Sequence, residues 1–220
     1  MPAMTSNIDH PNTLPLATPP APSPQAVLDF WFADGLQTGW PTEEMKAIWF
    51  GGGPSLDAQI TASFGAQVLQ AVGGGLTAWE DQPLSRLALI LLLDQFTRNV
   101  FRGAPRAFEG DTRAQQLVID ALANARDQQL PVVGRVFLYM PLMHAENLAL
   151  QNECVSRFTQ LVADAPATLA VRLQNNLEFA RQHQEIIAIF GRFPHRNSAL
   201  GRISTAAEAT FLINGPRFGQ

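Results

Sequence analysis

The spacing of apolar and polar residues predicts helices from about residue 24 onward, and no segment alternates as a convincing strand would. QAVLDFWF carries its large apolar side chains at helical spacing, and Ser23 before Pro24 is typical of an N-cap followed by a first-turn proline. SLDAQITASFGAQVLQAV repeats apolar residues every fourth position from Leu56 to Val72. The glycine triplets at 51–53 and 73–75 separate helices. They are not phosphate loops, since neither follows a strand and no GxxxxGK or GxGxxG is present.

Eight or nine helices joined by short turns predict an all-α fold of stacked antiparallel helix pairs. No self-similarity at a fixed period of about 34 residues is visible, so the residues alone predict no regular repeat array. The expected helices cover residues 24–32, 42–50, 55–72, 83–99, 109–128, 132–149 with a bend at Pro141, a segment through Val155 and Val162, 168–190, and a short helix opened by Ser204 with Glu208 near its first turn.

The N-terminal residues differ in composition from the rest. Residues 1–24 contain seven prolines and few large apolar side chains. Such a segment cannot bury enough surface to offset the entropy lost on ordering. We therefore expect a disordered tail over 1–24 and a single all-helical domain over 25–220.

Charge is scarce along the chain. Charged residues make up 15% of the sequence, against about 25% in typical soluble proteins, so many helix faces must be buried. The formal net charge of -4 gives no general attraction to nucleic acid or acidic membranes. Lys46 is the one lysine, so nearly all positive charge sits on arginines, which make forked bonds to carboxylates and phosphates.

Other sequence features bear on location. The longest apolar run, LALILLL, is far shorter than the ~20 residues that span a bilayer. No basic segment followed by an apolar one opens the chain, so no secretory signal is recognised. Cys154 is the single cysteine, which excludes an intramolecular disulfide and fits a reducing compartment. These features predict a cytoplasmic protein.

The helix 83–99 carries the first candidate chemistry, in LALILLLDQFTRNVFRG. Projection at about 100° per residue places Asp94 and Arg98 on one stripe, which Arg102 extends if the helix continues. An acid four residues before an arginine is the better orientation for a helical ion pair. Two interpretations stay open: a partly buried structural pair, or an arginine that reaches into a cleft while Asp94 orients it.

A second cluster lies in FLYMPLMHAENLALQNE. His144, Asn147 and Gln151 fall at i, i+3 and i+7, so we expect them to share a helical face that does not include Glu146. A lone histidine on a mostly apolar helix can be a satisfied core residue, or it can serve as a general base or bind a ligand.

The third cluster is GRFPHRN, after the helix 168–190, whose apolar face His183 interrupts. Gly191 ends that helix and Pro194 blocks its continuation. The remaining polar side chains then sit on a rigid corner beside a helix N-terminus, where they could bind an anion. The alternative is that they cap carbonyls and pair with acids such as Glu109 or Asp111. The corner residues concerned are Arg192, His195, Arg196 and Arg202.

Two other kinds of site have little support. HExxH and CxxC are absent, and the histidines have no recognised ligand spacing, so we expect no metal and no cofactor. GxSxG is absent, and Cys154 lies mid-helix with no base near it in sequence.

Three stretches, LLLDQFTRNVFRG, FLYMPLMHAENL and FGRFPHRNSALGRIST, resemble the signatures of DUF924, a bacterial family of unknown function. The likeness spans roughly residues 25–212. It implies an all-helical, TPR-like right-handed superhelix, and brings no established reaction, cofactor or partner. The family's polar signature maps onto Asp94, Gln95, Arg98, Asn99, Arg102, His144, Arg192, His195, Arg196, Asn197, Arg202, Ser204 and Thr205.

The chain departs from the family pattern at four positions. Thr97 replaces a proline, Met143 and Asn147 replace acids, and Ala145 replaces a serine. The middle cluster has therefore lost charge, although Glu146 remains.

Three functional hypotheses follow. The first is a binding module whose pocket takes a small anion or an acidic peptide end, with apolar walls from Trp31, Trp49 and Tyr139. The second is a metal-independent enzyme that uses a histidine, His144 or His195, as acid or base and an arginine to stabilise an oxyanion. The third is a purely structural role. The candidate ligand-binding residues are Asp94, Arg98, Arg102, His144, Arg192, His195, Arg196 and Arg202.

Overall fold

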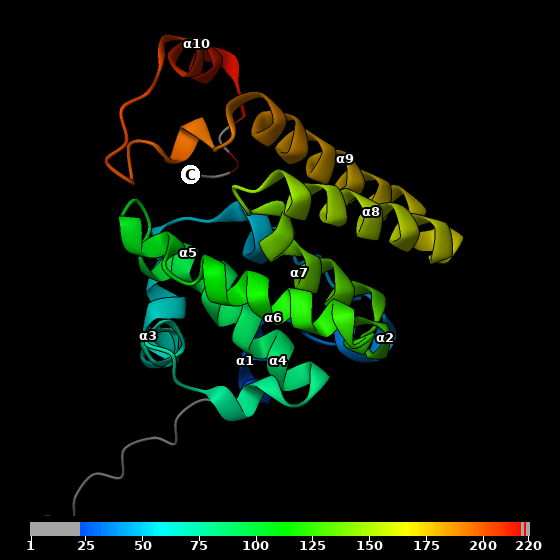
Figure 1. Ribbon diagram of the computed structural model, residues 1–220. Coiled ribbons are helices and arrows are strands. Elements are labelled where there is room, and N and C mark those ends of the chain that lie inside the picture. The colour runs from blue at the N-terminus through cyan, green and yellow to red at the C-terminus, as the bar shows by residue number, and fades with distance from the viewer. Residues whose placement is uncertain (1–22, 217, 219–220) are drawn as a thin grey trace, which may run out of the picture.

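The computed structural model describes residues 23–216 and 218, and every regular element in that part of the chain is helical (Figure 1). The predicted all-α class is confirmed. The predicted tail over 1–24 lies outside the described residues except for its last two positions. The assignment of 25–220 to one domain stays a prediction.

The elements are joined by short connections. They run in the order α1 (Pro24–Phe32), α2 (Gly35–Thr38), the π-helical turn η1 (Ala47–Gly51), α3 (Pro54–Val72), the 3-10 turn η2 (Thr77–Glu80), α4 (Pro83–Ile90), the π-helical turn η3 (Leu91–Phe96), α5 (Thr97–Val100), the 3-10 turn η4 (Pro105–Phe108), α6 (Asp111–Ala123), the 3-10 turn η5 (Arg126–Gln129), α7 (Val132–Met143), α8 (Leu148–Asp164), α9 (Ala167–Phe190), the 3-10 turn η6 (Pro194–Arg196) and α10 (Ala206–Asn214).

The first helix begins as its sequence predicts. The Ser23 hydroxyl accepts a hydrogen bond from the Ala26 N–H, and Pro24 occupies the first turn. The apolar face of α1 is fully buried, and the rings of Trp31 and Phe96 lie 5.3 Å apart. Burial of each such large side chain stabilises the fold by about 1.5–3 kcal/mol relative to exposure.

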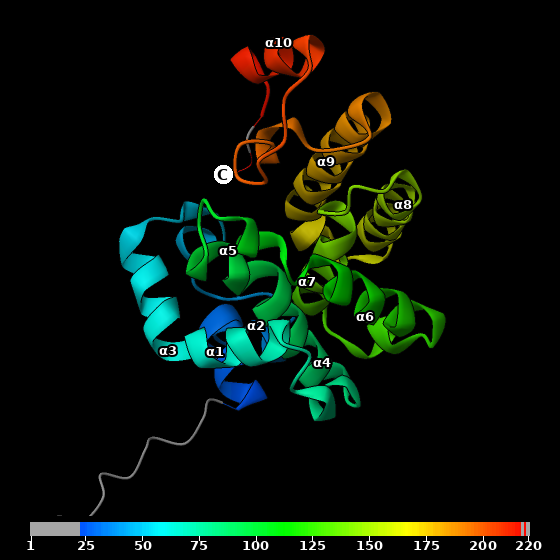
Figure 2. The same cartoon turned by 60° about the vertical axis from the view of Figure 1, so that its left-hand side comes forward.

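Two groups of helices share one apolar core. α1 packs on α4, and α3 packs on η3 and α5. α7 packs on α8, and α8 packs along α9 after a turn at Ala165 and Pro166 (Figures 1 and 2). α10 lies beyond the end of α9, away from α1 to α6. The antiparallel α8–α9 pair agrees with the expected stacking, while the right-handed superhelix stays a prediction.

The helix expected over 42–50 is wrong apart from its end, where η1 forms. The Asp34 carboxylate accepts hydrogen bonds from both the Thr42 N–H and the Thr42 hydroxyl, at 3.0 and 2.8 Å. Thr42 is thus held by a residue eight positions earlier and does not cap a helix. The Trp49 indole N–H donates to the Trp31 carbonyl, which ties η1 to α1.

The helix expected over 132–149 is also too long. α7 ends at Met143, and Asn147 is the N-cap of α8, its side chain accepting from the N–H groups of Ala149 and Leu150. The buried Gln151 amide donates to the carbonyls of Met143 and Ala145. The shared helical face of His144, Asn147 and Gln151 is therefore wrong, because the chain turns between them.

The region from Pro83 to Val100 is one continuous helical run, as predicted, but its middle is π-helical. η3 contains Asp94, so a uniform projection at 100° per residue does not apply there. π-helical turns within α-helices recur at functional sites. α6 is shorter than predicted, since Ala125 has a left-handed backbone (φ 52°) before η5.

The corner GRFPHRN forms as a rigid reversal. Gly191 ends α9 in the left-handed region at φ 68°, and Pro194 opens η6. Thr205, one residue later than expected, caps α10 in a capping box with Glu208. Their mutual bonds occupy the cap and N3 backbone N–H groups, so this helix start offers fewer donors to an anion.

Candidate functional site

An open hollow of about 1000 Å³ lies between α9, η1, the end of α7 and the region around α5. Five of the eight predicted site residues line it: Arg98, Arg102, His144, His195 and Arg196. It is called the His144 pocket here. Its apolar wall includes Trp31, Trp49, Met140, Met143 and Phe179. Tyr139, expected in that wall, is instead buried beside α8 and donates its hydroxyl to Asp127 at 2.7 Å.

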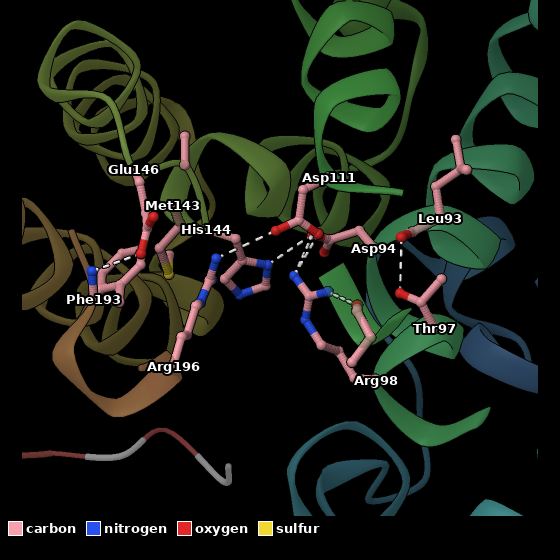
Figure 3. Close-up of polar contacts among 12 residues, drawn as sticks. Leu93, Asp94, Thr97, Arg98, Asp111, Met143, His144, Glu146, Phe193 and Arg196 are labelled. Carbon is pink, nitrogen blue, oxygen red and sulfur yellow. Dashed lines mark hydrogen bonds and ion pairs between the residues drawn. The ribbon is translucent and has the colours of Figure 1, made fainter. Parts of the chain in front are cut away.

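Asp94 lies behind the pocket and holds His144. The Asp94 carboxylate is 1% exposed, and its Oδ1 lies 2.8 Å from His144 Nδ1 (Figure 3). Burial alone would raise the pKa of Asp94, but His144, Arg98 and the Gln95 amide together lower it. An ionised carboxylate only accepts hydrogen bonds, so Nδ1 of His144 carries the proton. Nε2 then remains for the pocket, which the half-buried imidazole lines.

Arg98 is fixed by several contacts from α6 and η4. Its guanidinium donates to Asp111 Oδ1 at 2.7 Å and to the Ala107 carbonyl, and it lies 4.7 Å from the centre of the Phe108 ring. The predicted partner Asp94 is more distant, at 3.8 Å. The i, i+4 pair exists, but Asp111 is the stronger partner.

Arg196 reaches the same acid from η6. Its NH1 lies 3.3 Å from Asp111 Oδ2, and its guanidinium lies over the rings of Phe108 and Phe193 at 4.8 and 4.6 Å. The residue is 6% exposed, and its Nε–H has no acceptor among the described residues. Burial, followed by repulsion from Arg98, lowers the pKa of Arg196 to about 10, so the group stays charged at neutral pH.

Asp111 joins the two arginines. It is the first residue of α6, and both guanidinium groups converge on it in Figure 3. Burial, with a smaller contribution from the Asp94 charge, raises the pKa of Asp111 against the opposing arginines. From the sequence, this acid is expected only as a structural partner of the corner arginines. Its one local signal is a carboxylate in a first helical turn.

Two further histidines lie near His144. The ring of His183 on α9 is 6.2 Å from that of His144, and its Nδ1 lies 2.8 Å from the Phe179 carbonyl. Burial lowers the pKa of His183 and of His195 to about 3 each. Both are therefore neutral at pH 7. His195 can offer hydrogen bonds but no charge, which weakens its expected role as an anion contact.

The other predicted arginines are bound to acids. Arg102 lines the pocket and donates to the Asp57 carboxylate at 2.6 and 2.8 Å. Arg192 and Arg202 do not line it. Arg192 makes a forked pair with Glu208 at 2.6 and 2.8 Å.

Arg202 makes a second forked pair, with Glu146, and that acid also accepts from the Phe193 N–H at 2.8 Å. The pair and the Glu146–Phe193 contact, which Figure 3 shows, fix the corner against the turn after α7. Arg202 also borders a smaller hollow of about 320 Å³ beside Ser204. Of the eight predicted residues, five therefore line the pocket and Asp94 lies behind it. Arg192 and Arg202 belong to the structural corner, where the alternative of pairing with acids holds.

The departures from the family pattern have structural roles. The Thr97 hydroxyl donates to the Leu93 carbonyl at 2.8 Å within the helix, and Asn147 caps α8. Met143 adds apolar surface to the pocket. Further polar residues line the pocket from α9, where no local pattern marks them: Arg172, Asn175, Asn176, Glu178 and Gln182. Glu44 and Lys46 line it from the segment before η1.

Two absences concern residues 23–216 and 218. No group of three or more histidine, cysteine, aspartate or glutamate side chains there is arranged to hold a metal ion. Within the same range, no helix is both long and apolar enough to cross a bilayer.

Comparison with known proteins gives a family and a fold. The family model described as "Bacterial protein of unknown function (DUF924)" matches residues 27–216. A solved protein of unknown function from Agrobacterium tumefaciens is 31% identical, with a TM-score of 0.72 over 87% of this chain and 97% of that one. No curated protein matches the chain. The resemblance inferred from the three signatures is confirmed.

Proposed function

This chain belongs to the bacterial family of unknown function DUF924, and we propose that it binds a small organic anion in the His144 pocket. The observation that carries the proposal is the meeting of Arg98, His144 and Arg196 at one opening. These side chains come from three separate parts of the chain. Arginine suits such a site because its planar fork matches a carboxylate or a phosphate.

The size of the pocket favours an organic ligand over a bare ion. About 1000 Å³ is at the upper end of the range of small-molecule sites. Tryptophan and methionine side chains supply the apolar wall, and the arginines would fix the orientation of the charged group.

The charge state of Asp111 supports anion binding. With Asp94 and Asp111 both ionised, the guanidinium groups of Arg98 and Arg196 face two carboxylates, and little net charge remains. Because burial raises the pKa of Asp111, an incoming anion would favour its protonation and take its place beside Arg98 and Arg196. Binding should therefore take up a proton, and affinity should rise as the pH falls.

The test starts with native mass spectrometry of the purified protein, which should detect a retained small molecule. Titration calorimetry then uses acetate, benzoate and inorganic phosphate as probes. Arg196→Gln should weaken the best probe about tenfold or more, since hydrogen bonds to charged groups contribute about 1.5–3 kcal/mol. Arg106→Gln is the matched control, because Arg106 is an exposed arginine of η4 that pairs with Glu109, and neither residue lines the pocket. Equal affinity in folded Arg196→Gln protein and wild type would refute the proposal.

A second function, acid–base catalysis without a metal, is favoured by the contact between Asp94 and His144. A carboxylate on Nδ1 fixes the tautomer in which Nε2 can take a proton from a bound substrate, and it stabilises the imidazolium that forms. Arg98 would then stabilise negative charge left on the substrate. Incubation of a retained ligand with wild type should yield a product of altered mass or structure. His144→Gln should keep the ligand and form no product. Equal turnover by His144→Gln would exclude this role.

A further inference from the structure

The side chain of Phe218 lies in the His144 pocket. Its ring stacks on that of His183, with centroids 3.8 Å apart and planes at 28°, and it meets the His195 ring edge-on at 5.5 Å. Phe218 follows α10, so the chain returns to the pocket after leaving it at η6. One of the protein's own aromatic rings thus covers the His183 ring at the pocket wall.

The place that Phe218 occupies is built for a ring. His183 is 5% exposed and uncharged at pH 7, because burial lowers its pKa to about 3. Phe193, fully buried, stands edge-on to His183 at 5.5 Å, and His195 closes the third side. Stacked and edge-on arrangements at these separations are the favoured geometries for aromatic groups. These three residues are called the aromatic slot.

The aromatic slot adjoins the charged part of the pocket. The His183 ring lies 6.2 Å from the His144 ring, and the Arg196 guanidinium lies over Phe193 at 4.6 Å. One small molecule can therefore touch the slot with a ring and the guanidinium with an acid group.

Phe218 packs at the edge of a small apolar cluster rather than within the core. It is only partly buried, and its backbone has φ 48°, a left-handed conformation that bulky residues rarely adopt. Its ring contacts are with His183 and His195 of the slot, and it packs against the small cluster of Ile186, Ile187 and Phe193. These observations describe a group that a better-fitting ring could displace.

We infer that the ligand of the His144 pocket is an aromatic acid, whose ring takes the place of Phe218 in the aromatic slot while its acid group faces Arg196 and His144. The inference rests on the proposed function and names the ligand class. Phe218 then acts as an internal competitor. The apparent affinity equals the intrinsic affinity multiplied by the fraction of molecules in which Phe218 has left the slot.

The experiment measures affinities by titration calorimetry with three probes and the full-length chain. The probes are 3-phenylpropanoate, hexanoate as the aliphatic acid, and 3-phenylpropanamide as the uncharged aromatic. Phe218→Ala should bind 3-phenylpropanoate about five- to tenfold more tightly than wild type, because the competing ring is gone. Hexanoate should gain less than about twofold, since it makes no stacking contact. Phe101→Ala is the control, because Phe101 lies under the Arg106 guanidinium outside the pocket and should leave all affinities unchanged.

The outcomes separate the two proposals. Weaker or unchanged binding of 3-phenylpropanoate to Phe218→Ala, or equal gains for hexanoate, would overturn the aromatic slot while leaving the anion site in place. Equal affinity for the acid and the amide would uphold the slot and refute the anion site. No binding of any probe to either protein would refute both. Phe218→Leu, which keeps the apolar bulk, should give an intermediate gain, and a loss of affinity there would also count against the inference.

Discussion

Nδ1 of His144 lies 2.8 Å from Oδ1 of Asp94, although 50 residues separate them in the sequence. This contact joins the turn after α7 to the π-helical turn η3 and lies beneath the pocket. A buried carboxylate beside an imidazole and a guanidinium is stabilising only while its partners remain.

Asp94→Asn should destabilise the fold by about 3 kcal/mol, because it removes the buried charge that compensates Arg98 and weakens the acceptor that holds His144. Urea denaturation measures the change. Asp164→Asn on the exposed end of α8 is the matched control and should change stability by less than about 0.5 kcal/mol. If the two variants are equally stable, the Asp94 contacts contribute nothing to the fold.

Gly110→Ala should be strongly destabilising. A Cβ there would lie 2.9 Å from the carbonyl carbon of Leu93 and closer still to its oxygen, so α6 would have to move away from η3. The shift would also displace Asp111 from both arginines. We expect a loss of about 3 kcal/mol in urea denaturation.

Gly65→Ala is the matched control for that substitution. Gly65 lies within α3, and an added Cβ would meet its nearest neighbour, Thr61, at 3.7 Å. Alanine should stabilise this helix by about 0.5–1 kcal/mol. The change in unfolding free energy is therefore expected to have opposite signs at Gly110 and Gly65. The same sign at both would show that the approach of α6 to η3 is not tight.

Glu208 should contribute to stability in a definite pH window. Hydrogen bonds from Arg192, then from the Thr205 N–H, lower the pKa of Glu208 from 4.5 to about 2, and burial opposes them less strongly. The folded-state pKa is below the unfolded one, so this contribution is complete above pH 4.5 and disappears as the pH falls toward 2.

As the pH falls from 4.5 to 2, the unfolding free energy of Glu208→Gln should therefore decrease less steeply than that of wild type. The difference in slope corresponds to at most about one bound proton. Denaturation curves between pH 2 and 6 provide the measurement. Arg192→Gln should flatten the same window, because it removes the partner that lowers the pKa. If the unfolding free energy of both variants depends on pH as that of wild type does, the lowered pKa of Glu208 is contradicted.

The Cys154 thiol should not react with thiol reagents in the native protein. Its side chain is fully buried in α8, and burial raises the pKa of its thiol. With Ellman's reagent at pH 8, the folded protein should show almost no reaction, and urea should expose one thiol per chain. Rapid reaction without denaturant would mean that α8 opens readily from the core.

The sequence predicted elements that depend on neighbouring residues. The start of α1 at Ser23 and Pro24, the buried stripe of α3 and the end of α9 at Gly191 all follow from caps and from helical periodicity. The three signature stretches also identified the family.

Local patterns failed where a distant residue intervened. The helix expected from Thr42 is lost because Asp34 holds that residue. α7 stops at Met143, where Gln151 from the next helix takes up the freed carbonyl. The first break has no signal within a few residues, whereas the second has one in Asn147, the N-cap of α8.

By itself the sequence determined the fold class, most helices and the polar residues worth attention, because helix formation and capping act over three or four positions. Only the tertiary structure decided which arginines meet Asp111, which pair at the corner, and that Phe218 enters the pocket. Charge pairing and ring stacking act between groups close in space, and separations such as the 85 residues between Asp111 and Arg196 leave no local pattern.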